Sequence, residues 1–130
     1  MTLIKPYDDS LVIAGQGTLG LELARQLKTL EVKKADVLIC CGGGGLCAGV
    51  ALAFSDVAPD LRVRPCEPES YDDTARSLKS GKRETNNNLS QSICDAILTP
   101  TPGEKTFPIL KELVGPGLVV SDDEVLFTIA

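Results

Sequence analysis

Two glycine clusters are the residues in this sequence whose type and spacing most clearly indicate chemistry. The first is Gly15-x-Gly17-x-x-Gly20 within "VIAGQGTLG", and the second is the run Gly42–Gly45 within "CCGGGGLCAG". A glycine-rich turn that leads from a strand into a helix can bind phosphate, because its backbone N–H groups and the helix N-terminus attract an anion. Each cluster is therefore a candidate phosphate site.

The first cluster matches a dinucleotide-binding turn only in part. Leu11–Ala14 is predicted as a strand, and an amphipathic helix is predicted after Gly17. A dinucleotide site also needs a carboxylate at the end of the next strand to bind the ribose. The acidic candidate, Asp36, opens the next strand instead of closing it. An NAD-binding half-domain thus remains a weaker alternative to a structural turn in which Gly20 permits close packing.

The second cluster is the better phosphate site. Gly42–Gly45 lies between a predicted buried strand, Asp36–Cys41, and a predicted helix, Leu46–Ala58, that is apolar nearly all round. Four consecutive glycines lose much backbone entropy on folding, so a purely structural turn rarely needs them. No carboxylate occupies the positive end of the helix, and no Gly-Lys-Ser/Thr sequence follows. The pattern favours a monophosphate on a small cofactor over a nucleotide.

Composition excludes several classes of function. The chain has 130 residues, enough for one domain, and a net charge of -5, which argues against a nucleic-acid surface. No apolar run is long enough to span a membrane, and no signal peptide is visible, so we expect a cytoplasmic protein. The five cysteines lack C-x-x-C spacing and are expected to be free thiols. The absence of histidine excludes Ser-His and Cys-His catalysis within this chain.

The predicted elements alternate along the chain. Further strands are predicted at Leu61–Cys66 and Leu118–Val120, and further helices at Asp72–Ser80, Ser92–Leu98 and Phe107–Val114. This alternation indicates an α/β domain with a parallel sheet. Ser121 and Glu124 form a capping box that starts a last helix, and because that helix is short we expect the natural protein to continue past Ala130.

Four segments occur in the order that is typical of one family. The segments "VIAGQGTLGLEL", "CGGGGL", "CEPESYDD" and "SICDAI" resemble the fold-type II pyridoxal-phosphate enzymes, in the branch of the serine/threonine dehydratases and serine racemase. The resemblance implies a three-layer α/β fold, like the large domain of tryptophan synthase β, with a mostly parallel sheet and helices on both faces. It implies that residues 1–130 are a single α/β domain from the middle of a larger, two-domain enzyme.

The resemblance also implies two sites. Gly42, Gly43, Gly44 and Gly45, with the amide of Leu46, would hold the phosphate of pyridoxal 5'-phosphate, and Gly15–Thr18 would be a scaffold turn. Glu67, the carbonyl of Tyr71 and Asp73 would bind Mg²⁺ or another divalent cation, for which oxygen ligands are suited. A capped helix start with a solvated face is the alternative for Glu67 and Asp73, and both interpretations stay open.

Other features of the family are missing from this chain. The Schiff-base lysine of the family lies in an N-terminal motif of the Ser-x-Lys type, and none of the eight lysines here has that context, so no catalytic residue is assigned. Ala96 stands where the family usually has glycine. We therefore expect a part of an oligomeric (dimeric or tetrameric) dehydratase that converts L-threonine or L-serine to a 2-oxo acid and ammonia, inactive as an isolated chain. A non-catalytic module that binds phosphate or pyridoxal phosphate is the alternative.

Overall fold

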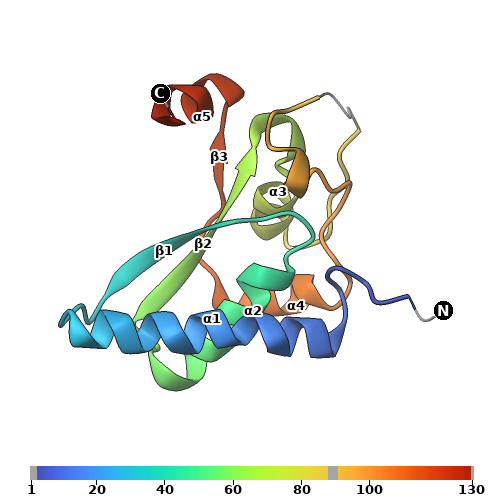
Figure 1. Ribbon diagram of the computed structural model, residues 1–130. Coiled ribbons are helices and arrows are strands. Elements are labelled where there is room, and N and C mark those ends of the chain that lie inside the picture. Colours follow the sequence, from blue (N-terminus) through green and yellow to red (C-terminus); the bar gives the residue numbers. More distant parts are fainter. Residues whose placement is uncertain (1–2, 88–90, 130) are drawn as a thin grey trace.

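The computed structural model describes residues 3–87 and 91–129, and it alternates helices and strands along the chain (Figure 1). The elements are α1 (Ser10–Thr29), β1 (Ala35–Cys40), α2 (Gly45–Val57), β2 (Leu61–Pro68), α3 (Asp73–Ser80), α4 (Thr106–Leu113), β3 (Leu118–Val120) and α5 (Asp122–Ile129). Short 3₁₀ turns occupy Glu69–Tyr71 and Asp95–Ile97. The order of elements confirms the predicted α/β class.

The three strands form a parallel sheet in the order β1-β2-β3. Cys40 at the end of β1 lies opposite Cys66 of β2, and Cys66 lies opposite Leu118 of β3. Because the strands are parallel, the loops that leave β1 and β2 emerge at the same edge of the sheet. The glycine run follows β1, and of the predicted cation ligands Glu67 lies at the end of β2 while Tyr71 and Asp73 follow it, so both candidate sites lie at this edge.

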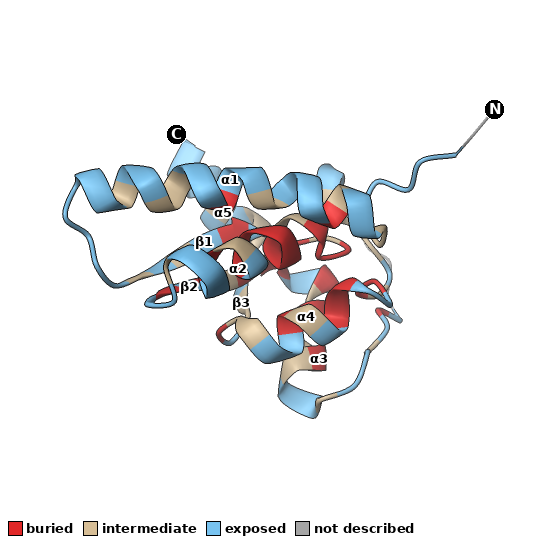
Figure 2. Cartoon of the chain, turned by 90° about the horizontal axis from the view of Figure 1, so that it is seen from below, coloured by how far each residue is buried: buried red, intermediate tan, exposed pale blue. Residues whose placement is uncertain are grey.

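Helix α2 is the centre of the hydrophobic core, as its apolar sequence predicts. Its residues Cys47, Ala48, Val50 and Phe54 are buried among α1, the sheet and α4 (Figure 2). Burial of a helix on most sides needs apolar residues around its whole circumference, and α2 has them. The helix is therefore held firmly where it meets the glycine run.

The first glycine cluster is helical, so the predicted strand Leu11–Ala14 and the predicted scaffold turn at Gly15–Thr18 are both wrong. Helix α1 begins at Ser10, after Asp9, whose side chain accepts hydrogen bonds from the N–H groups of Leu11 (2.8 Å) and Val12 (3.3 Å). Such a cap satisfies N–H groups that the helix itself leaves unpaired. The NAD-binding alternative loses its structural basis, because that site requires a strand and a turn here.

The glycines of α1 serve close packing on α2 instead. A Cβ atom on Gly17 would lie 3.2 Å from the carbonyl oxygen of Gly49, and one on Gly20 would lie 2.8 Å from the Cβ of Ala53. A Cβ atom on Gly49 would lie 2.7 Å from the amide nitrogen of Gly17. The two helices cross with their backbones nearly touching, so the expected close packing at Gly20 is confirmed.

Strand β1 differs from the expected fully covered strand. Within the described residues it lies at the edge of the sheet, with Ile39 buried and Leu38 61% exposed on the opposite face. On that exposed face Asp36 pairs with Arg62 (2.8 Å) and Arg64 (3.2 Å) of β2. The sequence of β1 is apolar enough for burial on both faces, but the residues that the structure describes cover only one face of this strand.

The remaining predicted elements are found with small changes. The segment predicted as a helix at Ser92–Leu98 forms only the 3₁₀ turn, and α3 ends at Gly81 in a left-handed conformation (φ 78°). The capping box is confirmed, since the N–H of Ser121 donates to the Glu124 carboxylate (2.8 Å) and the N–H of Glu124 donates to Ser121 Oγ (3.3 Å).

Candidate functional site

The glycine run forms the turn between β1 and α2. Gly44 caps α2 in a left-handed conformation (φ 90°), which a residue with a side chain adopts only with strain. No side chain caps this helix in the described chain, and its first turn has no acidic residue. The first N–H groups of a helix have no partner within it, and the dipole makes this end positive. The turn therefore presents backbone N–H donors that α2 itself does not pair.

Neighbouring elements fix the position of this turn. The carbonyl of Gly43 accepts hydrogen bonds from Thr106 Oγ1 (2.6 Å) and from the N–H of Gly103 (3.1 Å). A Cβ atom on Gly44 would lie 2.8 Å from a methyl group of Leu110 and 3.0 Å from Thr106 Oγ1. The start of α4 thus holds the loop, and no sequence pattern indicated this role for Thr106 or Gly103.

A cavity of about 460 Å³ lies against the loop, within the size of a small-cofactor site. Besides the four glycines and Leu46, its walls include Tyr7, Gln16, Ala96, Ile97 and Thr99. A Cβ atom on Gly43 would run into the Tyr7 ring, and one on Gly42 would lie 3.3 Å from the backbone of Ile97. The "SICDAI" segment therefore does approach the glycine loop closely, although Ala96 replaces glycine.

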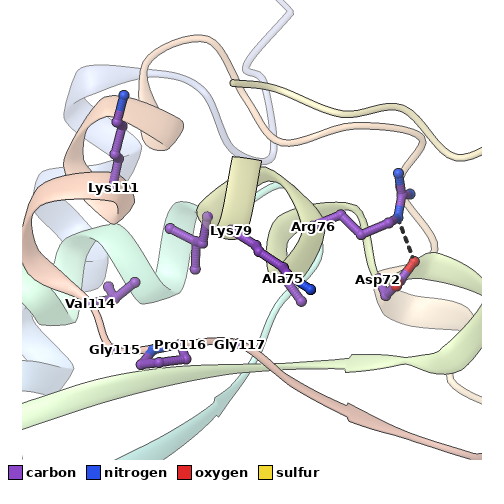
Figure 3. Close-up of a pocket in the computed structure, with 10 residues that line it drawn as sticks. Asp72, Ala75, Arg76, Lys79, Lys111, Val114, Gly115, Pro116 and Gly117 are labelled. Atoms are coloured by element: carbon purple, nitrogen blue, oxygen red, sulfur yellow. Dashed lines mark hydrogen bonds and ion pairs between the residues drawn. The ribbon is translucent and has the colours of Figure 1, made fainter. Parts of the chain in front are cut away.

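A larger cavity, about 620 Å³, lies elsewhere and contains none of the predicted site residues (Figure 3). It is bounded by α3, the end of α4 and the turn Gly115–Gly117. Two of the three cations that line it have protein partners, since Arg76 pairs with Asp72 (2.8 Å) and Lys111 donates to the carbonyl of Gly81 (2.9 Å), and Lys79 is the third. Arg76 and Lys111 point to different sides, so they do not form a common anion site.

Glu67 meets one part of the capped-helix interpretation, which the sequence left open beside the cation site. It is 1% exposed at the end of β2, and its carboxylate accepts hydrogen bonds from the N–H groups of Thr74 (2.9 Å) and Ala75 (2.7 Å) in the first turn of α3. The side chain thus caps a helix start, as one interpretation requires. Its surroundings are buried, however, and not the solvated face that the same interpretation expects.

Asp73 is also 1% exposed and has an oxygen that helix capping does not explain. Its Oδ1 accepts a hydrogen bond from Asn86 Nδ2 (2.6 Å), whereas its Oδ2 has no hydrogen-bond partner among the described residues. A buried oxygen without a partner is costly, and a bound cation would remove that cost. Tyr71, whose carbonyl is the third predicted ligand, is buried in the 3₁₀ turn between the two acids.

The electrostatics of this pair favour a positive ligand. Burial raises the pKa of Glu67 to about 7, against the opposing effect of the N–H groups of Ala75 and Thr74, and the charge of Asp73 adds to the rise. Burial raises the pKa of Asp73 to about 6, which the hydrogen bond from Asn86 opposes. Within residues 3–87 and 91–129 no three His, Cys, Asp or Glu side chains form a metal cluster, so a cation here would need backbone or water oxygens.

Cys47, buried beside the glycine loop, is not suited to act as a nucleophile. All five are free, which confirms the expected thiols, and Cys41 and Cys47 are buried beside the glycine loop. A hydrogen bond with Cys41, together with burial, raises the pKa of the Cys47 thiol far above its usual range. Buried thiols that stay protonated are unreactive.

Fold and site together define a class: a parallel α/β domain with an anion-binding glycine loop at the end of a strand. The family model described as pyridoxal-phosphate dependent enzyme matches residues 1–130. This chain belongs to that family, and pyridoxal phosphate is the cofactor the family uses.

Curated relatives narrow the branch of the family. The chain is 38% identical over 122 residues to the catabolic L-threonine dehydratase of Escherichia coli (strain K12), which covers 94% of this chain and 36% of that protein. It is 39% identical over 126 residues to the serine racemase of Dictyostelium discoideum, covering 96% of this chain and 37% of that protein. The chain therefore spans little more than a third of the length of these relatives.

A solved structure agrees with this placement. The crystal structure of a threonine deaminase from T.th. superposes with a TM-score of 0.88 at 44% identity, over 94% of this chain and 44% of that one. The predicted fold-type II class and branch are thereby confirmed.

Proposed function

We propose that this chain is the phosphate-binding part of a pyridoxal-phosphate-dependent dehydratase that converts L-threonine or L-serine to a 2-oxo acid and ammonia. The observation that carries the proposal is the glycine loop, which presents the uncapped start of α2 to a cavity of cofactor size. The bound cofactor supplies an electron sink for the reacting amino acid. The names of the relatives, threonine dehydratase and serine racemase, support this substrate class.

Each part of the loop has a task in this proposal. The amides of Gly42, Gly43, Gly44, Gly45 and Leu46 donate hydrogen bonds to the phosphate, and the dipole of α2 stabilises its charge. The bonds from Thr106 and Gly103 to the Gly43 carbonyl hold the loop in place before the phosphate arrives. Tyr7 and Ile97 form walls that keep water from the bound group.

The chemical steps need residues that this chain does not provide. Lys79 and Lys82 each follow a Ser-x pair, but both come after the two glycine clusters, whereas the Schiff-base segment of the family is N-terminal to them. The chain also spans only 36% of the dehydratase it resembles. We therefore propose that it is one α/β domain portion of a larger two-domain enzyme, with the lysine on another part of the polypeptide. As an isolated chain it would bind the cofactor phosphate without catalysing the reaction.

A divalent cation site at Glu67, the Tyr71 carbonyl and Asp73 is the second part of the proposal. Two buried carboxylates with raised pKa values, one of which has an unpartnered oxygen, support it. Mg²⁺ or Ca²⁺ would neutralise this pair and complete its coordination with water. Through Glu67 the ion would also stabilise the first turn of α3.

The proposal extends to assembly and location. None of the helices in the described part of the chain is long and apolar enough to cross a membrane. Exposed apolar side chains, among them Phe127 (86% exposed) on α5 and Leu38 on β1, support burial by more polypeptide in a homo-oligomeric enzyme. Five unpaired thiols support a reducing, cytoplasmic location.

Retention of the cofactor tests the proposal. In the Gly44→Asp variant the new carboxylate competes for the anion site, and we expect retention of pyridoxal phosphate, measured by its absorbance after gel filtration, to be lost. The matched control is Gly15→Asp, because a Cβ at Gly15 meets nothing within 4 Å. Full retention in Gly44→Asp would contradict the assignment. In the full-length wild-type protein, retention of the cofactor without 2-oxo acid production from threonine or serine would favour the non-catalytic binding module.

A further inference from the structure

One buried asparagine connects the two candidate sites. Asn86 is 7% exposed, and its Nδ2 donates one hydrogen bond to Asp73 Oδ1 (2.6 Å) and another to the carbonyl of Thr99 (3.0 Å). Its Oδ1 accepts a hydrogen bond from Arg76. Asp73 belongs to the proposed cation site, and Thr99 lines the cavity beside the glycine loop. Both hydrogens of the Asn86 side-chain amide are thus donated, one toward the proposed cation site and one toward the cavity beside the glycine loop.

The two hydrogen bonds from Asn86 Nδ2 form a bridge between Asp73 and Thr99, and these two residues share an unusual feature. Within the described parts of the chain, two buried side-chain polar atoms have no hydrogen-bond partner, and they are Asp73 Oδ2 and Thr99 Oγ1. Orphaned buried oxygens are rare and require an explanation. Here each lies on a residue that Asn86 holds, and each belongs to a site where a ligand is proposed.

The bridge reaches the glycine loop through Thr99. A Cβ atom on Gly42 would lie 3.4 Å from Cγ2 of Thr99 and 3.3 Å from the backbone of Ile97, so this segment packs directly on the loop. A second route runs from Glu67 through Thr74 and Cys41 to the carbonyl of Gly42, but its contacts are sulfur contacts of 3.5 and 3.6 Å. Sulfur is a weak hydrogen-bonding partner, so the amide bridge is the stronger connection.

From these contacts we infer that Asn86 is a positioning residue that couples cation binding at Asp73 to phosphate binding at the glycine loop. This inference rests on the proposed function. A cation that fixes Asp73 also fixes the Asn86 amide, and the amide then fixes the Thr99 carbonyl and the cavity wall that packs on Gly42. Coupling between two sites is reciprocal, so each ligand raises the affinity for the other by the same factor.

The test measures, in the purified protein, the factor by which Mg²⁺ changes the affinity for pyridoxal phosphate. Pyridoxal phosphate is titrated by absorbance with Mg²⁺ present and with a chelator instead. We expect Mg²⁺ to tighten cofactor binding in wild type by about five-fold or more, within the usual range of site–site coupling. In Asn86→Ala both ligands still bind, but the factor falls below about two. Arg76→Gln is the matched control, because it removes the partner of the Asn86 side-chain oxygen and leaves both bonds from Asn86 Nδ2, so it keeps the wild-type factor.

Each outcome decides the inference. An undiminished factor in Asn86→Ala, or no coupling in a wild type that binds both ligands, overturns the role of Asn86 and leaves the proposed function intact. A wild type that binds neither ligand overturns both.

A wild-type measurement covers the case in which Asn86→Ala does not fold. Without cofactor, Mg²⁺ should slow hydrogen exchange of the Gly103 amide, which donates to the Gly43 carbonyl, by about two-fold or more. Unchanged exchange at Gly103 while Mg²⁺ protects the first turn of α3 would overturn the inference.

Discussion

At the scale of single residues, Glu67 and Asp73 show how burial turns two ordinary acids into a candidate site. Each is 1% exposed, and their pKa values rise to about 7 and about 6. Both residues were predicted as cation ligands only through a family resemblance. Two acids six residues apart do not by themselves indicate a cation site, because this spacing does not determine whether their side chains meet. Asn86 could not be predicted, since only the fold brings it beside Asp73.

The raised pKa values predict how stability depends on pH. Between about pH 4 and pH 7 the folded state binds more protons than the unfolded state, so the free energy of unfolding falls as pH rises through this window. With a chelator present, the loss from about pH 5 to pH 8 should be on the order of 2 kcal/mol, measured by urea unfolding.

Added Mg²⁺ or Ca²⁺ should reverse this loss near pH 8 and have little effect near pH 5, because protons compete with the cation for the same carboxylates. Glu67→Gln should lose the response to the cation. If the free energy of unfolding of the wild type changed with neither pH nor added cation, the proposed cation site would be contradicted.

At the scale of elements, α1 shows where sequence patterns are ambiguous. Four apolar residues before a glycine fit both a strand and a buried helix segment, and only the surroundings decide. Here the deciding partner is Gly49 on α2, whose missing side chain lets the backbone of α1 approach. The long or strongly patterned elements, α2 and β2, were predicted to within a few residues, because their burial follows from their own sequences.

The helix crossing predicts opposite effects for two glycine substitutions. In Gly49→Ala the new methyl group would meet the backbone of α1 at Ile13 and Gly17, so we expect a loss of about 1–3 kcal/mol in the free energy of unfolding. In the control, Gly15→Ala, the methyl group meets nothing within 4 Å, and helix propensity should add about 0.5–1 kcal/mol. Thermal or urea unfolding measures both, and a tolerated Gly49→Ala would contradict the close crossing.

At the scale of the whole molecule, the parallel sheet explains why two short segments far apart in sequence become one functional edge. The loops after β1 and β2 emerge together (Figure 1). Asn86 and Thr99, from the polar segment before α4, contact them, since Asn86 donates to Asp73 after β2 and Thr99 packs against Gly42 after β1. The order of strands and helices was enough to predict the parallel sheet, from which this shared edge follows. The polar segment was not predictable, because its residues follow no apolar period and make their contacts with distant parts of the chain.

The central claim is that the second glycine cluster binds the cofactor phosphate and the first is a packing surface. Selective ¹⁵N-glycine labelling and NMR titration with pyridoxal phosphate test it most directly. We predict that the amide signals of Gly42–Gly45 shift on binding, while those of Gly15, Gly17 and Gly20 within α1 stay in place. Shifts confined to the α1 glycines, with Gly42–Gly45 unchanged, would contradict the account.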